Sequence, residues 1–529
     1  MPNVLLVYPK NPVTFWSFDE ALKIAGKKCS FQPAGLLTVA GMLPERYEPR
    51  VIDENVEPLK DEDLKWADVV LTSSMIIHFD SLEEIIKRAN KHRKPVLSGG
   101  PLSTQYFKDI KGDATFFLGE AESGFVDSLD EIVSQGFVPG KRVIDRRKIF
   151  GSLRNTPLQR FDLIRDNLRH YASMAIQTTR GCPESCTFCN IPSLYGKLTR
   201  LKSAIDVIQE LQLLYDLKWR GPVMIVDDNI VGNQAAIIPI LKKTADWQER
   251  HNYPFPLHTQ GSLRMYENTE LMEAMYRAGF YQVFWGIESP VAESLKAMGA
   301  QKNLQITNER GRKSMLDKVR EIQATYFRGQ AGFIIGFDAD PSDIADRMKK
   351  FIDESRISVA MVGPLGVLPD TPDWIRYSRD NRLMGSVRYN GDSGLFAKEL
   401  SYIPRYPDGS EMDPEVVLGR HREVVQHTNN PENYFERTLD YLMHRKRKPL
   451  RQTRVDFTNF KAALRSFYYQ GFKSDYKRTY WSYLWNVARH DINDIPDAIT
   501  YAVEGHHLIT LTKRELSKRS DQVGLETSV

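Results

Sequence analysis

The stretch that decides the fold is residues 177–189, which read Gln-Thr-Thr-Arg-Gly-Cys-Pro-Glu-Ser-Cys-Thr-Phe-Cys. It holds three of the four cysteines of the chain, Cys182, Cys186 and Cys189, within eight positions. Thiolates are soft ligands and are the usual protein ligands of iron–sulfur clusters. Three of them leave one iron of a four-iron cubane without a protein ligand, so that iron can bind a small molecule.

Two other interpretations of these cysteines are a structural zinc site with a distant fourth ligand and a set of buried thiols. Zinc sites usually take their ligands in two pairs, whereas the remaining cysteine, Cys29, lies in a different predicted domain. We expect Cys29 to be a buried structural thiol. Four cysteines in 529 residues do not make a disulfide framework, and their clustering fits a reducing cytoplasm.

Short apolar runs alternate with helical periodicity from this stretch onward. Helical segments such as Ala204–Tyr215 and Thr269–Arg277 separate the runs. Six strand–helix units predict an α/β partial barrel of the TIM type, open on one side. The predicted barrel strands are Ser173–Thr178, Val223–Val226, Leu257–Gln260, Gln282–Gly286, Gly332–Gly336 and Val359–Val362.

The first part of the chain alternates in the same way and predicts a Rossmann-like, doubly wound domain. Ligands of such domains bind beyond the carboxyl ends of the strands. We expect this domain over residues 1–140, a linker over 141–170, the barrel over 171–375 and a mainly helical domain over 376–529. The five predicted strands of the first domain are Val4–Tyr8, Arg50–Asp53, Asp68–Thr72, Pro95–Leu97 and Thr115–Leu118.

Composition narrows the function. The net charge of +4 is small for this length and argues against a dedicated nucleic-acid partner. The first ten residues show no signal peptide, and the chain has no apolar run of 18 residues that would span a membrane. We therefore expect a cytoplasmic protein.

The spacing Cys-x-x-x-Cys-x-aromatic-Cys after the first barrel strand resembles the signature of the radical S-adenosylmethionine superfamily. The resemblance implies one [4Fe–4S] cluster on Cys182, Cys186 and Cys189, with S-adenosylmethionine bound at the open iron. It also implies reductive cleavage to a 5′-deoxyadenosyl radical, with an electron donor such as flavodoxin or ferredoxin. Phe188 would lie near the adenine.

Later strand ends resemble further superfamily segments in the same order. Many members carry Gly-Gly-Glu after the second strand, where this chain has Asp227 and Asp228, so the resemblance gives amino-group recognition to Asp227 or Asp228. The other residues that the resemblance assigns to cofactor binding are Gln260, Glu288, Ser289, Gly332 and Gly336.

Small residues follow three strands of the first domain. They permit close approach of a large flat ligand, and ordinary tight turns are the alternative. The arrangement resembles the cobalamin-binding domain of one radical S-adenosylmethionine subclass, but residues 8–12 lack the cobalt-ligating histidine of the methionine-synthase type. We expect His78 to be a polar loop residue. The residues assigned to cobalamin are Ser73, Ser74, Met75, Gly99, Gly100, Gly119 and Glu120.

The C-terminal part resembles the DUF4070-type extension of hopanoid C2-methylase-like members of this subclass. Residues 445–454 hold six Lys or Arg and no acid, and the stretch 457–489 is rich in aromatic residues. Such a region can lie on an anionic bilayer, line a tunnel for an apolar substrate, or form a packed helical cap. Peripheral contact with the inner membrane surface is one expectation.

The resemblance implies a cobalamin-dependent methyltransferase that acts on an unactivated carbon of a small, apolar molecule, such as a hopanoid or another lipid. Two S-adenosylmethionine molecules would be used per turnover. The alternative is a radical enzyme that joins, cyclises or rearranges carbons without methyl transfer. A third hypothesis is a non-enzymatic electron carrier or sensor. It is disfavoured because such a protein needs neither an open iron nor a barrel of this size.

Overall fold

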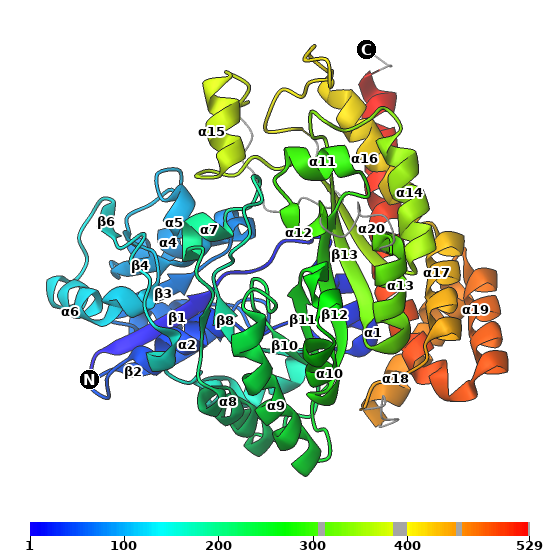
Figure 1. The fold of residues 1–529 in the computed structure, drawn as a ribbon. Helices are drawn as coiled ribbons and strands as arrows, with labels where there is room; N and C mark the ends of the chain where they lie inside the picture. Colours follow the sequence, from blue (N-terminus) through cyan, green and yellow to red (C-terminus); the bar gives the residue numbers. More distant parts are fainter. Residues whose placement is uncertain (305–312, 385–398, 451–456, 527–529) are drawn as a thin grey trace.

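The computed structural model describes residues 1–304, 313–384, 399–450 and 457–526. These residues form two large parallel sheets and a helical C-terminal region (Figure 1). The first sheet lies at one side of the molecule, the second in the middle, and helices α17 (Pro431–His444) and α19 (Lys477–His490) at the other side. The predicted α/β fold class, with a Rossmann-like domain, a partial barrel and C-terminal helices, is confirmed.

The first sheet has six described strands in the order β2-β1-β3-β4-β5-β6, and all neighbours are parallel. The prediction of five strands was wrong, because β6 lies inside the stretch 141–170 that was expected to be a linker. None of its residues is buried, so this edge strand lacks the apolar run that marks the others. The strands are β1 (Asn3–Tyr8), β2 (Glu48–Asp53), β3 (Val69–Ser73), β4 (Val96–Gly99), β5 (Thr115–Leu118) and β6 (Arg142–Asp145).

Helices cover both faces of this sheet, which is why its inner strands are apolar on both sides. Helices α3 and α4 pack on one face, and α2 and α6 pack on the other. Because β1 lies between β2 and β3, the winding reverses there and leaves the crevice in which such sheets bind ligands. The helices are α2 (Ala34–Met42), α3 (Asp61–Trp66), α4 (Phe79–Lys91), α5 (Gly100–Tyr106) and α6 (Phe125–Gln135).

The second sheet has six described parallel strands in the order β14-β13-β12-β11-β10-β7. Its strands follow one another along the chain, with helices between them, as in an open barrel. All six predicted barrel strands are present. They are β7 (Met174–Ile176), β10 (Val223–Ile225), β11 (Leu257–Gly261), β12 (Phe280–Glu288), β13 (Arg328–Ile335) and β14 (Val359–Pro364).

The open side of the barrel, between the edge strands β7 and β14, is covered by chain from the first domain. This crossing segment, residues 9–33, includes α1 (Asp19–Ala25) and runs from β1 toward the C-terminal helices (Figure 1). Near β14, the indole N–H of Trp16 lies 3.2 Å from the Met361 sulfur. Near β7, the Ser173 amide donates to the Ser30 carbonyl at 2.9 Å. The first domain therefore supplies one wall of the barrel.

Side-chain amides occupy the free edge of β7. Gln32 accepts from the Ala175 amide at 2.8 Å and donates to the Ala175 carbonyl at 2.7 Å. Gln159 donates to the same carbonyl at 3.0 Å. An unpaired strand edge invites pairing with another chain, and here two glutamines take the place of the missing strand.

Cys29 lies in the crossing segment. Its side chain is buried, and its thiol donates to the Phe31 carbonyl at 3.2 Å. Burial raises the pKa of this thiol to about 12. The prediction of a buried structural thiol is confirmed.

The C-terminal region is helical, as expected. It contains helices α16 (Pro414–Thr428) and α17, and the aromatic-rich stretch 457–489 divides into α18 (Phe457–Ser466), a π-helical turn (Phe467–Lys473) and α19. The long α20 (Ile495–Glu526) packs against α1, α17 and α19. No helix in the described ranges is long and apolar enough to cross a membrane.

Candidate functional site

The three clustered cysteines lie on the loop that follows β7, at the carboxyl end of the barrel. Gly181 precedes them with φ +91°, and a Cβ atom there would stand 2.6 Å from the Leu198 carbonyl oxygen. Only glycine fits this position. Between the second and third cysteines, the Thr187 amide donates to the Met298 carbonyl at 2.9 Å. The loop path is thus fixed by backbone contacts rather than by the cysteines themselves.

All three thiols are free, with Cys186 buried and Cys182 and Cys189 half-buried. Burial raises the pKa of all three, to about 11 for Cys186 and about 12 for Cys189. In the part of the chain that the structure describes, no three His, Cys, Asp or Glu side chains are grouped closely enough to hold a metal ion. A cubane binds each thiolate through a different iron, so this donor set fits a cluster better than a preformed site for one ion.

Asp227, after β10, holds the entry to the cysteine loop. It is fully buried, and one of its carboxylate oxygens accepts from the amides of Thr178 and Thr179 at 2.7 and 2.8 Å. The Thr178 hydroxyl donates to the other oxygen. Burial raises the pKa of Asp227 to about 6. These contacts give Asp227 a structural role, because its acceptor sites face the protein's own backbone.

The next two residues also face the cysteine loop. Asp228 accepts from the Gly181 amide at 3.0 Å, and burial raises the pKa of its carboxyl. Asn229, which the sequence reasoning did not single out, places its amide nitrogen 3.8 Å from the Cys182 sulfur. An amide donor beside a cluster thiolate tunes its electronic properties.

Glu288 and Ser289 end β12. Glu288 has φ +67° and lies 3.1 Å from the ammonium of Lys302, a residue that sequence reasoning missed. Burial lowers the pKa of Lys302, but Glu288 and the nearby thiols outweigh this and raise it, so the ammonium stays charged. The Ser289 hydroxyl accepts from the Val291 amide at 3.2 Å.

Of the remaining predicted residues, Gly332 lies within β13, Gly336 follows β13, Gln260 lies near the end of β11 and Phe188 lies in the cysteine loop. A Cβ on Gly332 would stand 3.0 Å from the Phe284 ring, and one on Gly336 (φ +106°) would meet the Tyr402 hydroxyl at 2.5 Å. Phe188 packs edge-on against Phe337, with ring centroids 6.2 Å apart. Gln260 is the penultimate residue of β11, where its carbonyl accepts from the Ile230 amide at 3.2 Å.

In the first domain, the small residues at the strand ends touch one another. Gly100 has φ +89°, and a Cβ there would stand 2.8 Å from both the amide nitrogen and the carbonyl oxygen of Ser74, and 2.9 Å from the Ser73 hydroxyl. The Ser74 amide donates to the Gly99 carbonyl at 3.3 Å. The Ser74 hydroxyl is buried and has no partner among the described residues. A buried hydroxyl without a partner, beside glycines that have no side chain, fits close approach of a ligand.

His78 is not available to a metal. Its Nδ1 accepts from the Met75 amide at 3.1 Å, and its Nε2 lies 2.6 Å from the Asn11 side-chain oxygen. Burial lowers its pKa to about 4. The expectation of a polar loop residue was wrong, because His78 is fully buried at the end of a 3₁₀ turn (Ile76–His78). Met75, which precedes this turn, is 45% exposed.

Glu120 joins the two domains. Its buried carboxylate binds the Arg200 guanidinium through both oxygens, at 2.6 and 2.7 Å, and lies 3.6 Å from Arg180. Glu122 pairs with Arg180 at 3.2 Å. Although burial opposes it, Arg180 lowers the pKa of Glu122, so this carboxylate is ionised. Gly119 (φ +108°) forms the turn after β5 that directs Glu120 and Glu122 toward the barrel.

Gln105 of α5 makes a second connection between the domains. It accepts from the Asn190 amide group at 2.8 Å, next to the last cysteine, and donates to the Pro369 carbonyl at 3.2 Å. Together with the Glu120 network, this contact shows that the carboxyl edges of the two sheets face each other. Sequence reasoning missed Gln105, Arg180 and Arg200 because their partners are far away in the chain.

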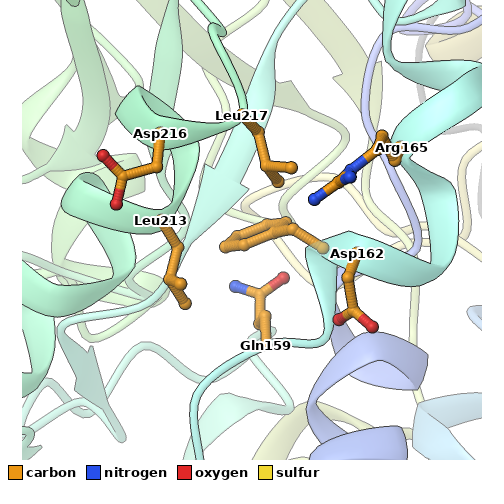
Figure 2. Close-up of a pocket in the computed structure, with 7 residues that line it drawn as sticks. Gln159, Asp162, Arg165, Leu213, Asp216 and Leu217 are labelled. Atoms are coloured by element: carbon orange, nitrogen blue, oxygen red, sulfur yellow. The ribbon is translucent and has the colours of Figure 1, made fainter.

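A surface pocket lies at the opposite end of the barrel. Figure 2 shows Leu213, Asp216 and Leu217, at the end of α8 (Ala204–Asp216), facing Gln159, Asp162 and Arg165. These residues come just before β7 and β10, so they line the amino ends of the strands. Barrel enzymes react at the carboxyl ends, and this pocket is separate from the cysteine loop.

Comparisons with known proteins cover the whole chain. An uncharacterized methyltransferase of Synechocystis, sll1242, is 33% identical over 515 residues, which span 96% of this chain and 91% of the relative. The hopanoid C-2 methylase of Rhodopseudomonas palustris is 28% identical, spanning 98% of this chain and 94% of that protein. The family model "Domain of unknown function (DUF4070)" matches residues 371–521.

A solved structure has the same layout. The cobalamin-dependent S-adenosylmethionine radical enzyme OxsB, with aqua-cobalamin and S-adenosylmethionine bound, aligns with a TM-score of 0.57 and 12% identity, over 99% of this chain and 81% of that one. The fold and the cysteine loop define the class, a radical S-adenosylmethionine enzyme whose barrel follows a cobalamin-type domain. Within that class, the chain belongs to the methyltransferase family of sll1242 and the hopanoid C-2 methylase.

Proposed function

We propose that this enzyme uses one [4Fe–4S] cluster, S-adenosylmethionine and cobalamin to methylate an unactivated carbon of a small, apolar, lipid-like substrate. The observation that carries the proposal is the facing of the two sheet edges, held by Glu120 and Gln105. A ligand in the crevice of the first sheet would then face a ligand at the cysteine loop. The hopanoid C-2 methylase, a relative over nearly the full length, supports a polycyclic membrane lipid as substrate class.

When bound, the cluster supplies the electron that cleaves S-adenosylmethionine, and cobalamin supplies the methyl group. The residues that would hold the cluster are Cys182, Cys186 and Cys189, with Asn229 donating toward the first sulfur. Asp227 and Asp228 position the loop through its backbone amides.

Charged and small residues complete the site. Lys302, kept charged beside Glu288, provides a cation near the thiols for an anionic carboxylate. In the first domain, Ser73, Ser74, Gly99 and Gly100 would line the cobalamin crevice, and Met75 would face the ring in place of a histidine. Glu120 keeps the domains in register rather than touching a cofactor, because Arg200 occupies both of its oxygens.

The reaction needs an electron donor of the flavodoxin or ferredoxin type, since reductive cleavage of S-adenosylmethionine consumes one electron. A lipid substrate also places the enzyme at the inner surface of the membrane, as a peripheral protein.

The first experiment is cofactor analysis of protein purified without oxygen from cells supplied with cobalamin. We expect iron–sulfur absorption and about one cobalamin per chain, and transfer of labelled methyl from S-adenosylmethionine to a lipid extract. Cys186→Ala is the control that loses the cluster and the transfer. A cluster without cobalamin, with cleavage of S-adenosylmethionine but no labelled lipid, would instead indicate a non-methylating radical enzyme.

A further inference from the structure

The outer face of the C-terminal helices carries a row of exposed apolar side chains. Residues 460, 464, 468 and 472 follow one another at intervals of four along α18 and the π-helical turn, and 481 and 485 do so on α19. Such spacing places side chains on one helix face. These six residues, the aromatic face, are between 46% and 73% exposed: Phe460, Leu464, Tyr468, Phe472, Trp481 and Trp485.

The aromatic face is one surface rather than scattered residues. The Trp481 indole donates to the Gly471 carbonyl at 2.9 Å, which joins α19 to the π-helical turn. The rings of Tyr468 and Phe472 are nearly parallel, with centroids 6.5 Å apart. Figure 1 shows α18 and α19 at the edge of the molecule, away from the first sheet.

Helix α19 is apolar on two sides. Tyr480, Tyr483 and Val487 are buried in the helical core, while Trp481 and Trp485 point outward. A soluble helix normally presents polar residues to solvent, and a concentrated apolar patch marks an interaction surface.

The charge of this segment is strongly positive. Residues 457–490 contain six Lys or Arg and one acid, an excess of five, whereas the whole chain has an excess of four. The single acid, Asp475, is paired with Lys513 at 2.5 Å. Lys473 lies 4.8 Å from the centre of the Tyr468 ring. The basic residues are Lys461, Arg465, Lys473, Lys477, Arg478 and Arg489.

The sequence predicted that the basic stretch 445–454 could contact a bilayer. Its described residues, however, mostly form ion pairs within the protein. Arg445 pairs with Asp494 and Asp497, and Lys448 also pairs with Asp494. Arg447 pairs with Glu273 at 2.8 Å. Arg451 and Arg454 lie outside the described residues.

We propose that the aromatic face, with the basic residues of segment 457–490, binds the surface of an anionic lipid bilayer. Trp and Tyr rings have an apolar body and a polar tip and favour the headgroup level, and Lys and Arg are attracted to anionic headgroups. A symmetric contact between two copies of this face would oppose two positively charged surfaces, which is unfavourable. This inference deepens the proposed function, since a membrane lipid is reached at the bilayer.

The test is co-sedimentation of the full-length protein with vesicles. We expect binding to vesicles of phosphatidylglycerol and phosphatidylcholine in equal parts, weakening with added salt, and little binding to pure phosphatidylcholine. Phe472→Ser/Trp485→Ser should lower binding at least about tenfold, because two large apolar groups no longer insert. The matched control Ile205→Ser removes a residue that is 64% exposed on α8 and should bind as the wild type.

Equal binding by the double variant and the control would overturn the proposal, as would wild-type protein that ignores anionic vesicles. Self-association of the wild type that the double variant lacks would also overturn it, in favour of a second copy. Cluster content and cleavage of S-adenosylmethionine should be unchanged in the double variant. These two measurements test the proposed function independently of vesicle binding.

Discussion

The two parallel sheets have the same number of described strands, but the chain builds them in different orders. The first sheet starts in its interior at β1 and winds outward in both directions, so strand order alone leaves a crevice beside β1 and β3. The barrel sheet grows in one direction from β7 to β14 and has two free edges. It therefore needs Gln32, Gln159 and the crossing segment to cover them.

The strand ends differ as well. At β3 and β4 of the first sheet they carry small, uncharged residues, with Gly100 in contact with Ser73 and Ser74. Those of the barrel carry acids whose oxygens hold the cysteine loop. The comparison indicates that the first sheet is shaped for a bulky ligand, whereas the barrel end fixes the position of a reactive one.

The largest effect is expected at the barrel end. Cys186→Ala removes a cluster ligand and should abolish iron–sulfur absorption and lower cleavage of S-adenosylmethionine more than about 100-fold. Cys29→Ala, in the crossing segment, should keep both and cost about 2 kcal/mol of unfolding free energy. Anaerobic spectra and product analysis measure the first pair of effects, and urea unfolding measures the last. Equal loss of the cluster in both variants would contradict the assignment of the thiols.

The second-largest effect is expected at the Glu120 network, which connects the first domain to the barrel. Glu120→Ala removes the carboxylate partner of the largely buried Arg200 and should cost about 3–5 kcal/mol. Glu84→Ala breaks the exposed pair with Lys87 and should cost less than about 0.5 kcal/mol. Denaturant unfolding compares the two. Similar small losses would mean that the Glu120 network does not hold the domains together.

The crevice of the first sheet offers a matched pair of glycines. Gly100 and Gly409 share φ +89°, but a Cβ at Gly100 meets the Ser74 backbone at 2.8 Å, whereas Gly409 has nothing within 4 Å. Gly409→Ala should cost about 1 kcal/mol for the backbone conformation alone. Gly100→Ala should cost about 3 kcal/mol and weaken cobalamin binding, because the strand ends must separate. Thermal unfolding and a cobalamin titration measure both variants. Equal losses of stability and of cobalamin affinity in the two would contradict the role of Gly100.

The smallest effect concerns acid sensitivity of the first domain. His78 has a folded pKa of about 4, below its ordinary value of about 6.5, so the unfolded state binds the extra proton first. Stability from this residue is present above about pH 6.5 and is lost as the pH falls toward 4, by about 2 kcal/mol between pH 7.5 and pH 5. His78→Gln should reduce the slope of unfolding free energy with pH. An unchanged slope would assign the acid sensitivity to other groups.

Most strands of the two sheets could be predicted from the sequence, because buried parallel strands consist of continuous apolar runs. The edge strand β6 could not, since none of its residues is buried. The role of Glu120 was also hidden: its position after a strand was visible, but its partner Arg200 lies 80 positions away. The sequence also could not show that the basic stretch 445–454 is engaged in ion pairs, because its partners Glu273 and Asp494 are distant in sequence.

The crossing segment has a consequence for how the protein is made. Trp16 meets Met361 across 345 positions, and the Phe15 carbonyl meets His507 across 492. These residues leave the ribosome well before their partners in β14 and α20. Folding thus depends on contacts of very high sequence separation, which are slow to form. The crossing segment therefore lacks these partners until β14 and α20 have been synthesised, and deletion of residues 9–33 would remove part of the barrel wall.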